Sequence, residues 1–100
     1  MSGVLVLGAG GHGKVVADIL LLSGIKVLGF LDDNDHSTGM VHLGLPVLGK
    51  IDEYARHAPD GLVLGIGSNR VRRMIVGRLG AAAESLWINA IHPRATVAVS

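Results

Sequence analysis

The clearest chemical motif of the chain is the sequence GAGGHG at residues 8–13, which matches the pattern G-x-G-x-x-G. The apolar run at residues 4–7 predicts a buried strand before the motif, and apolar residues at helical spacing predict a helix after it. In such a turn the first glycine permits the sharp bend, the second lets backbone amides approach a phosphate, and the third lets helix and strand pack closely. The electropositive start of the helix also favours an anion. We therefore expect this turn to bind a nucleotide.

Other interpretations of this motif stay open. A glycine-rich turn can serve packing alone, without any ligand. His12 falls in the first turn of the predicted helix, where it either contacts the ligand or is an exposed or capping histidine. The histidines at positions 36, 42, 57 and 92 lack the H-x-H and H-E-x-x-H spacings of metal sites, so no metal is expected. No Ser-His-Asp arrangement can be assigned either.

Two acidic residues, Asp32 and Asp33, follow the second predicted strand at residues 26–31. The carboxyl ends of parallel strands are where an α/β sheet presents its ligand crevice. A carboxylate there accepts hydrogen bonds from ribose hydroxyls or base N–H groups but repels phosphate. We therefore expect at least one of the two at the nucleoside end of the ligand. The alternative is a simple turn, for which the sequence Asp-Asp-Asn is well suited.

A second glycine turn, with the sequence GIGSNRVRR at residues 65–73, follows the predicted strand 61–66. Ser68 or Asn69 can cap the helix that begins there. Arginines crowd the first turn of that helix, where each cation is unfavourable by about 0.3–1 kcal/mol, which suggests that one of them meets an anion. Solvated arginines on an exposed face are the alternative. We expect Asn69 and Arg72 to face the same crevice as the first motif.

The remaining pattern predicts alternating strands and helices. Residues 44–49 are expected to form a short extended segment, residues 52–58 a short helix and residues 86–91 a fourth strand, with residues 34–43 as a loop. The alternation predicts an α/β domain, a Rossmann-like open parallel β-sheet with helices on both faces. The helix after the second glycine turn has an apolar face. That face consists of Val71, Met74, Ile75 and Leu79.

Composition narrows the possible partners. One hundred residues suit a single small domain, and 49% of them are hydrophobic although only 3% are aromatic, which is typical of a buried parallel sheet. A net charge of +1 and the scarcity of aromatic residues argue against a nucleic-acid partner. No apolar run is long enough to cross a membrane, and the apolar N-terminus is interpreted as a strand rather than a signal peptide. The absence of cysteine suits a reducing, cytoplasmic location.

The motifs GAGGHGKVVADIL, GFLDD, LPVLG, IGSNRVRR and AIHPRATVAVS occur in this order along the chain. Together they resemble the N-terminal domain of the sugar O-acyltransferase family, which includes sialic-acid O-acetyltransferases and UDP-4-amino-sugar N-acetyltransferases. The resemblance implies that residues 1–92 form a Rossmann-like domain that binds a UDP-linked amino sugar, and that residues 93–100 begin the connection to a further domain. The binding residues that it implies are Gly8, Gly10, Gly11, His12, Gly13, Asp32, Asp33, Gly67, Ser68, Asn69 and Arg72.

In that family a C-terminal left-handed β-helix of hexapeptide repeats binds acetyl-CoA, forms the trimer and carries the catalytic histidine. The resemblance therefore implies that acetyl-CoA is the co-substrate of a homotrimeric full-length enzyme in bacterial glycan biosynthesis, and that residues 1–100 hold no catalytic residue and are inactive alone. His92 matches the segment before the repeats and is not expected to be the base. A mononucleotide ligand suits the chain, because a dinucleotide fold normally uses two β-α-β-α-β halves.

Two other functions stay open at this point. The glycine motif and the strand-end acid would equally serve a fragment of an NAD(P)-binding oxidoreductase. The other possibility is a non-catalytic module for nucleotide sensing or assembly. Hexapeptide repeats beyond residue 100 would favour the acyltransferase, and a second Rossmann half would favour the oxidoreductase.

Overall fold

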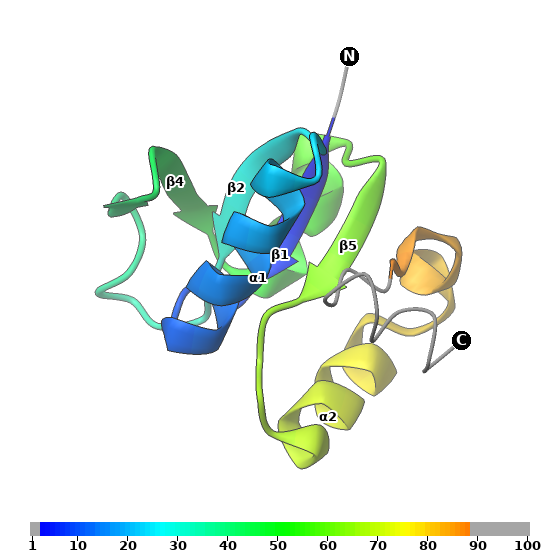
Figure 1. Cartoon of the computed structure of the whole chain (residues 1–100). Helices are drawn as coiled ribbons and strands as arrows, with labels where there is room; N and C mark the ends of the chain where they lie inside the picture. Colours follow the sequence, from blue (N-terminus) through cyan, green and yellow to red (C-terminus); the bar gives the residue numbers. More distant parts are fainter. Residues whose placement is uncertain (1–2, 89–100) are drawn as a thin grey trace.

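The structure is a computed structural model that describes residues 3–88. Within this range a five-stranded sheet has the order β3-β4-β2-β1-β5 (Figure 1). The strands are β1 (Val4–Leu7), β2 (Val27–Leu31), β3 (Val41–His42), β4 (Leu45–Gly49) and β5 (Gly61–Leu64). β1 pairs in parallel with β2 and with β5, and β2 pairs in parallel with β4, whereas β3 pairs antiparallel with β4.

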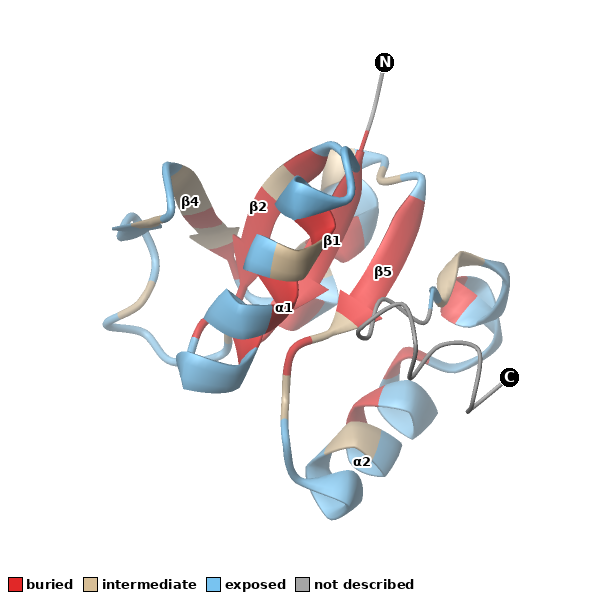
Figure 2. Ribbon diagram, in the orientation of Figure 1, coloured by how far each residue is buried: buried red, intermediate tan, exposed pale blue. Residues whose placement is uncertain are grey.

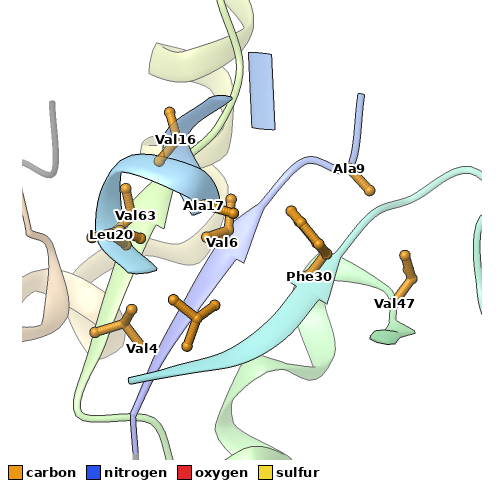
Figure 3. Packing of buried hydrophobic residues seen from close by; sticks show 10 residues of the cluster. Val4, Val6, Ala9, Val16, Ala17, Leu20, Phe30, Val47 and Val63 are labelled. Atoms are coloured by element: carbon orange, nitrogen blue, oxygen red, sulfur yellow. The ribbon is translucent and has the colours of Figure 1, made fainter. Parts of the chain in front are cut away.

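Helix α1 (Gly11–Leu22) connects β1 to β2 and covers one face of the sheet. Its C-cap is Ser23, whose Oγ donates a hydrogen bond to the carbonyl oxygen of Ile19 at 2.8 Å, and Gly24 follows with a φ of +77°. Such a left-handed glycine after the last turn is a common helix stop. Figure 3 shows the buried cluster beneath α1. Its members are Val4, Val6, Ala9, Val16, Ala17, Leu20, Val27, Phe30, Val47 and Val63.

The opposite face is covered by the 3₁₀ helix η1 (Ile51–His57), helix α2 (Asn69–Leu79) and the 3₁₀ helix η2 (Gly80–Leu86). Successive side chains of a strand point to opposite faces, so Val4 and Val6 join the cluster under α1 while Leu5 and Leu7 join the other one. All of β1 is therefore buried, as Figure 2 shows by its colour. The predicted Rossmann-like α/β fold with helices on both faces is confirmed.

The sheet is not wholly parallel, because the predicted loop 34–43 ends in β3, which forms a hairpin with β4. The two residues between the strands, Leu43 and Gly44, have φ values of 56° and 76°. A two-residue hairpin loop with positive φ at both positions matches the right-handed twist of the strands. Leucine rarely adopts this conformation, so the sequence Leu-Gly carries little of the usual hairpin signal.

The other elements differ from expectation in detail. The predicted extended segment 44–49 is the parallel strand β4, and the predicted helix 52–58 is the 3₁₀ helix η1. The predicted strand 86–91 is wrong at Leu86, which ends η2, but Trp87 forms a parallel bridge with Leu62 and the Ile88 N–H donates to the Leu62 carbonyl at 2.9 Å. Residues 89–91, and the predicted domain boundary after residue 92, lie outside the described residues.

Three glycines meet where the first turn leaves the sheet. A Cβ added at Gly13 would overlap the carbonyl oxygen of Gly8, one added at Gly8 would lie 2.8 Å from the carbonyl oxygen of Gly65, and one added at Gly65 would lie 2.7 Å from the Cα of Gly13. Gly8 also has a φ of +110°, which strains any other residue. The start of α1 can therefore approach the ends of β1 and β5 only because all three side chains are hydrogen atoms.

This contact generates the first prediction. The variant Gly13→Ala should lower the free energy of unfolding by about 1–3 kcal/mol, because the added methyl meets backbone rather than a mobile side chain. Gly11→Ala is the matched control two residues earlier, where an added Cβ has no atom within 4 Å. It should be neutral or stabilising by up to about 1 kcal/mol, since alanine lowers the entropy of the unfolded chain. Urea unfolding measures both, and equal midpoints would contradict the glycine contact.

Candidate functional site

A cleft of about 720 Å³ opens at the carboxyl ends of β1 and β5. β2 lies on one side of β1 and β5 on the other, so the chain reverses its direction of strand addition here. Open α/β sheets bind ligands at this topological switch point, and the volume is in the ordinary range for small-molecule sites. The cleft is bounded by the first glycine turn, the end of β2, the second glycine turn and one side of α2.

The first glycine turn brings unbonded amides to this cleft. Gly10 is the N-cap of α1, and no side chain caps this helix in the described part of the chain. The first amides of a helix lack carbonyl partners within the helix, so they can donate to an anion. Gly10, Gly11 and His12 are exposed and line the cleft, whereas Gly13 is buried beneath them. This end of the cleft is therefore suited to a phosphate.

The second glycine turn differs from the first, because its helix already has a cap. The hydroxyl oxygen of Ser68 accepts a hydrogen bond from the N–H of Val71 at 3.3 Å. Gly67 lines the cleft just before this cap. The two glycine turns are thus similar in sequence, but of the two helices that follow them α1 starts without a side-chain cap and α2 starts with one.

Asp32 positions the first glycine turn. One carboxylate oxygen accepts a hydrogen bond from the N–H of Ala9 at 2.8 Å, and the other accepts from the N–H of Asn34 at 2.9 Å. The end of β2 is thereby tied both to the turn after β1 and to its own following turn. This geometry is compatible with both predicted functions of Asp32. The residue forms the turn, and it also lines the cleft where a ligand is expected.

Asp33 connects the end of β2 to two other elements. Its Oδ1 accepts a hydrogen bond from the N–H of Ile51 at 3.1 Å, at the start of η1. Its Oδ2 forms an ion pair of 3.0 Å with Nη1 of Arg78 on α2, and Nε of Arg78 donates to Oδ1 of Asp52 at 3.0 Å. The side chains of Asp33 and Arg78 are 47% and 41% exposed. Because water reaches both, each pair stabilises the fold by no more than about 1 kcal/mol.

Lys50 supports the turn that holds these acids. Its Nζ donates to the carbonyl oxygen of Asp33 at 3.2 Å and forms an ion pair with Asp35. The hydrogen bond and charge of Lys50 hold the pKa of the Asp35 carboxyl below its usual value, and the hydrogen bond to Asp35 raises the pKa of Lys50. Both side chains are exposed, so salt screens the pair.

The wall opposite the glycine turn is formed by α2. Val71, Met74, Ile75 and Arg78 recur at the spacing i, i+3, i+4, i+7 and therefore share one helix face, which lines the cleft. Ile75 is 5% exposed, whereas Val71 and Met74 are 39% and 59% exposed. The predicted apolar face of this helix is thus divided, with its C-terminal part in the core and its N-terminal part facing the cleft.

Asn69 and Arg72 lie on the other side of α2. With Arg73 and Val76 they form a second stripe at the same spacing, which lines a separate depression of about 540 Å³. Two residues of offset on a helix amount to about 200°, which turns this stripe away from the cleft. The structure therefore brings together the predicted Gly8, Gly10, Gly11, His12, Asp32, Asp33 and Gly67, and separates them from Asn69 and Arg72. A ligand contact by Asn69 or Arg72 stays a prediction.

Arg78, Met74 and Ile51 line the cleft but were not among the predicted site residues. The helical spacing from Val71 to Arg78 was available in the sequence, but an apolar stripe is ordinarily assigned to the core. Among residues 3–88, no group of three or more His, Cys, Asp or Glu side chains could hold a metal ion. No helix within residues 3–88 is both long enough and apolar enough to cross a membrane.

Comparison with known proteins places these features in a family. The family model of the PglD N-terminal domain matches residues 3–79. UDP-N-acetylbacillosamine N-acetyltransferase from Bacillus subtilis is 34% identical over 105 residues, which cover 100% of this chain and 47% of that protein.

Two solved structures are similar to this one. Perosamine N-acetyltransferase from Caulobacter crescentus, in complex with CoA and GDP-perosamine, has a TM-score of 0.72 and 34% identity, covering 93% of this chain and 44% of that one. The acetyltransferase domain of PglB from Neisseria gonorrhoeae, in complex with acetyl coenzyme A, has a TM-score of 0.59 and 32% identity over 78% of this chain and 38% of that one. The chain spans less than half the length of each of these relatives. In agreement with the resemblance seen in its motifs, the chain belongs to the PglD N-terminal domain family.

Proposed function

We propose that the chain is the substrate-binding domain of an acetyl-CoA-dependent sugar N- or O-acetyltransferase of bacterial glycan biosynthesis, and that its cleft binds a UDP-linked amino sugar. The observation that carries this proposal is that hydrogen-bond donors and carboxylate acceptors line the same cleft at the switch point of the sheet. Uncapped helix amides lie at the glycine turn, and carboxylates lie at the end of the neighbouring strand. The family membership and the N-acetyltransferase names of its relatives support the same conclusion.

In this proposal each part of the ligand has a matching surface. The amides of residues 10–13 donate to the diphosphate, because the start of α1 is electropositive and uncapped. The Ala9 amide is already bonded to Asp32, so it does not take part. The nucleoside lies toward Asp32 and Asp33, whose negative charge keeps phosphate at the other end. Met74, which lines the cleft and is exposed, supplies apolar surface for the base.

The chemical step requires groups beyond those described. An amine or hydroxyl of the sugar would attack the carbonyl carbon of the acetyl thioester while a general base takes its proton; the new N–C or O–C bond replaces the C–S bond, and CoA leaves and is protonated to the thiol. We assign neither that base nor an acetyl-CoA site to residues 1–100, and we propose that a hexapeptide-repeat domain of a homotrimeric cytoplasmic enzyme supplies both. The relatives that bind CoA or acetyl coenzyme A support this division, since each is more than twice as long as the segment it shares with this chain.

Nucleotide titration of the chain tests the binding function. UDP and a UDP-linked amino sugar should release or absorb heat on binding in isothermal titration calorimetry, whereas NADH should give none, because the cleft offers one diphosphate cradle and one nucleoside end. Binding of NADH with no binding of UDP would favour the oxidoreductase instead. No heat of binding with any of the nucleotides would favour an assembly module.

A side chain placed at Gly11 should block the ligand without unfolding the domain. A Cβ there meets no atom within 4 Å, and the residue lines the cleft. Gly11→Leu should therefore weaken UDP binding by about ten-fold or more, which corresponds to ~1.4 kcal/mol. Ala82→Leu, on the exposed surface of η2, is the control for an added leucine and should bind UDP as the unchanged chain does. Equal affinities in the two variants would place the diphosphate elsewhere.

The chain alone should not transfer acetyl groups. Incubation with acetyl-CoA and a UDP-linked amino sugar should give no more free thiol than acetyl-CoA alone, because no base or acetyl-CoA site is assigned to it. The chain contains no cysteine, so a thiol reagent reports CoA without background from the protein. Turnover above that background would place catalytic groups within these 100 residues.

A further inference from the structure

Two charged groups at the nucleoside end of the cleft have bonding capacity to spare. Arg78 and Asp33 form an ion pair of 3.0 Å, and both line the cleft while remaining partly exposed. An arginine has five N–H donors, and Arg78 uses Nε toward Asp52 and Nη1 toward Asp33. A carboxylate has about four acceptor positions. In Asp33, Oδ1 accepts a hydrogen bond from the Ile51 N–H, and Oδ2 is paired with Nη1 of Arg78. A free donor and a free acceptor therefore lie side by side.

This arrangement distinguishes the bases of nucleotides. Uracil and guanine each carry a carbonyl acceptor beside a ring N–H donor, which pairs with a donor beside an acceptor. Cytosine and adenine carry an amino donor beside a ring nitrogen acceptor. In the same orientation the amino group would face the donor of Arg78, and the ring nitrogen would face the carboxylate of Asp33. When a bound base covers the ion pair and excludes water from it, a polar group left unpaired costs about 1–3 kcal/mol.

The surrounding residues favour contact with a base at this position. Ile51, whose amide is bonded to Asp33, is 3% exposed and lines the cleft beside the pair. Met74 lies one helical turn before Arg78 on the same face of α2 and is 59% exposed. The exposed side chain of Met74 therefore gives a flat base an apolar surface on which to pack while its polar edge meets the ion pair. The uncapped start of α1 at the other end of the cleft orients the ligand through its phosphates.

We infer, on the basis of the nucleotide binding proposed above, that Arg78 and Asp33 together determine base specificity, accepting uracil and guanine nucleotides and rejecting cytosine and adenine nucleotides. Arg78 donates to the base carbonyl, and Asp33 accepts from the adjacent ring N–H. The ion pair between them keeps donor and acceptor in register, so that the pair acts as one recognition element. The substrate class of the cleft is thereby a nucleoside diphosphate whose base has a keto group next to a ring N–H.

Titration of the chain with UDP, GDP, CDP and ADP by calorimetry at constant salt tests this inference. UDP and GDP should bind at least about ten-fold more tightly than CDP and ADP. Comparable affinity for all four nucleotides would overturn the inference while leaving nucleotide binding intact. Binding of none would remove both the inference and the proposed function.

Variants separate recognition from a purely structural role of the ion pair. Asp33→Asn retains an oxygen for the Ile51 amide but replaces an acceptor by a donor, and Arg78→Gln removes the cation, so each should reduce the preference for UDP over CDP by about ten-fold. Asp52→Asn is the matched control, because Asp52 also bonds Arg78 but does not line the cleft. It should leave the UDP to CDP ratio unchanged. An unchanged ratio in both Asp33→Asn and Arg78→Gln, with urea unfolding showing folded protein, would overturn the inference.

Discussion

The closeness of α1 to the sheet depends on the contact among the backbones of Gly8, Gly13 and Gly65. These residues come from the turn after β1, the first turn of α1 and the end of β5, and any Cβ among them would meet backbone atoms at 2.8 Å or less. The contact brings the uncapped helix start directly over the switch point of the sheet. The packing of this turn and the ligand binding proposed for it therefore depend on the same contact, so the structural and the functional interpretation of the glycine motif are compatible.

The rest of the cleft is assembled from strand ends rather than from one long loop. β1 contributes the glycine turn, β2 contributes Asp32 and Asp33, and β5 leads into Gly67. Asp32 bonds the β1 turn, and Asp33 bonds η1 and α2, so each acid connects its own strand to a neighbour. Parallel strands end at one edge of a sheet, which is why residues far apart in the sequence converge here.

Features with a local cause were predictable from the sequence. The strands of the core, the glycine turn and the strand-end acids follow from apolar runs and glycine spacing, and the structure confirms the fold that they imply. The rotation of α2 was not predictable, because an apolar stripe can face a core or a cleft, and tertiary packing decides between them. That rotation turned Asn69 and Arg72 away and brought Arg78 in. The β3–β4 hairpin was missed because Leu43 takes a conformation that leucine seldom adopts.

Helix α2 has hollows on two sides, and Gly77 borders both of them. Its buried anchors, Ile75 and Leu79, lie in its C-terminal half, while the half that begins at Asn69 rests on no buried side chain of its own. The C-terminal half of α2 is therefore the part whose side chains are buried in the core. Because Ile75 and Leu79 both lie beyond the first half of the helix, a substitution among the cleft-facing residues Val71 and Met74 would alter the cleft wall without removing a buried side chain of the core.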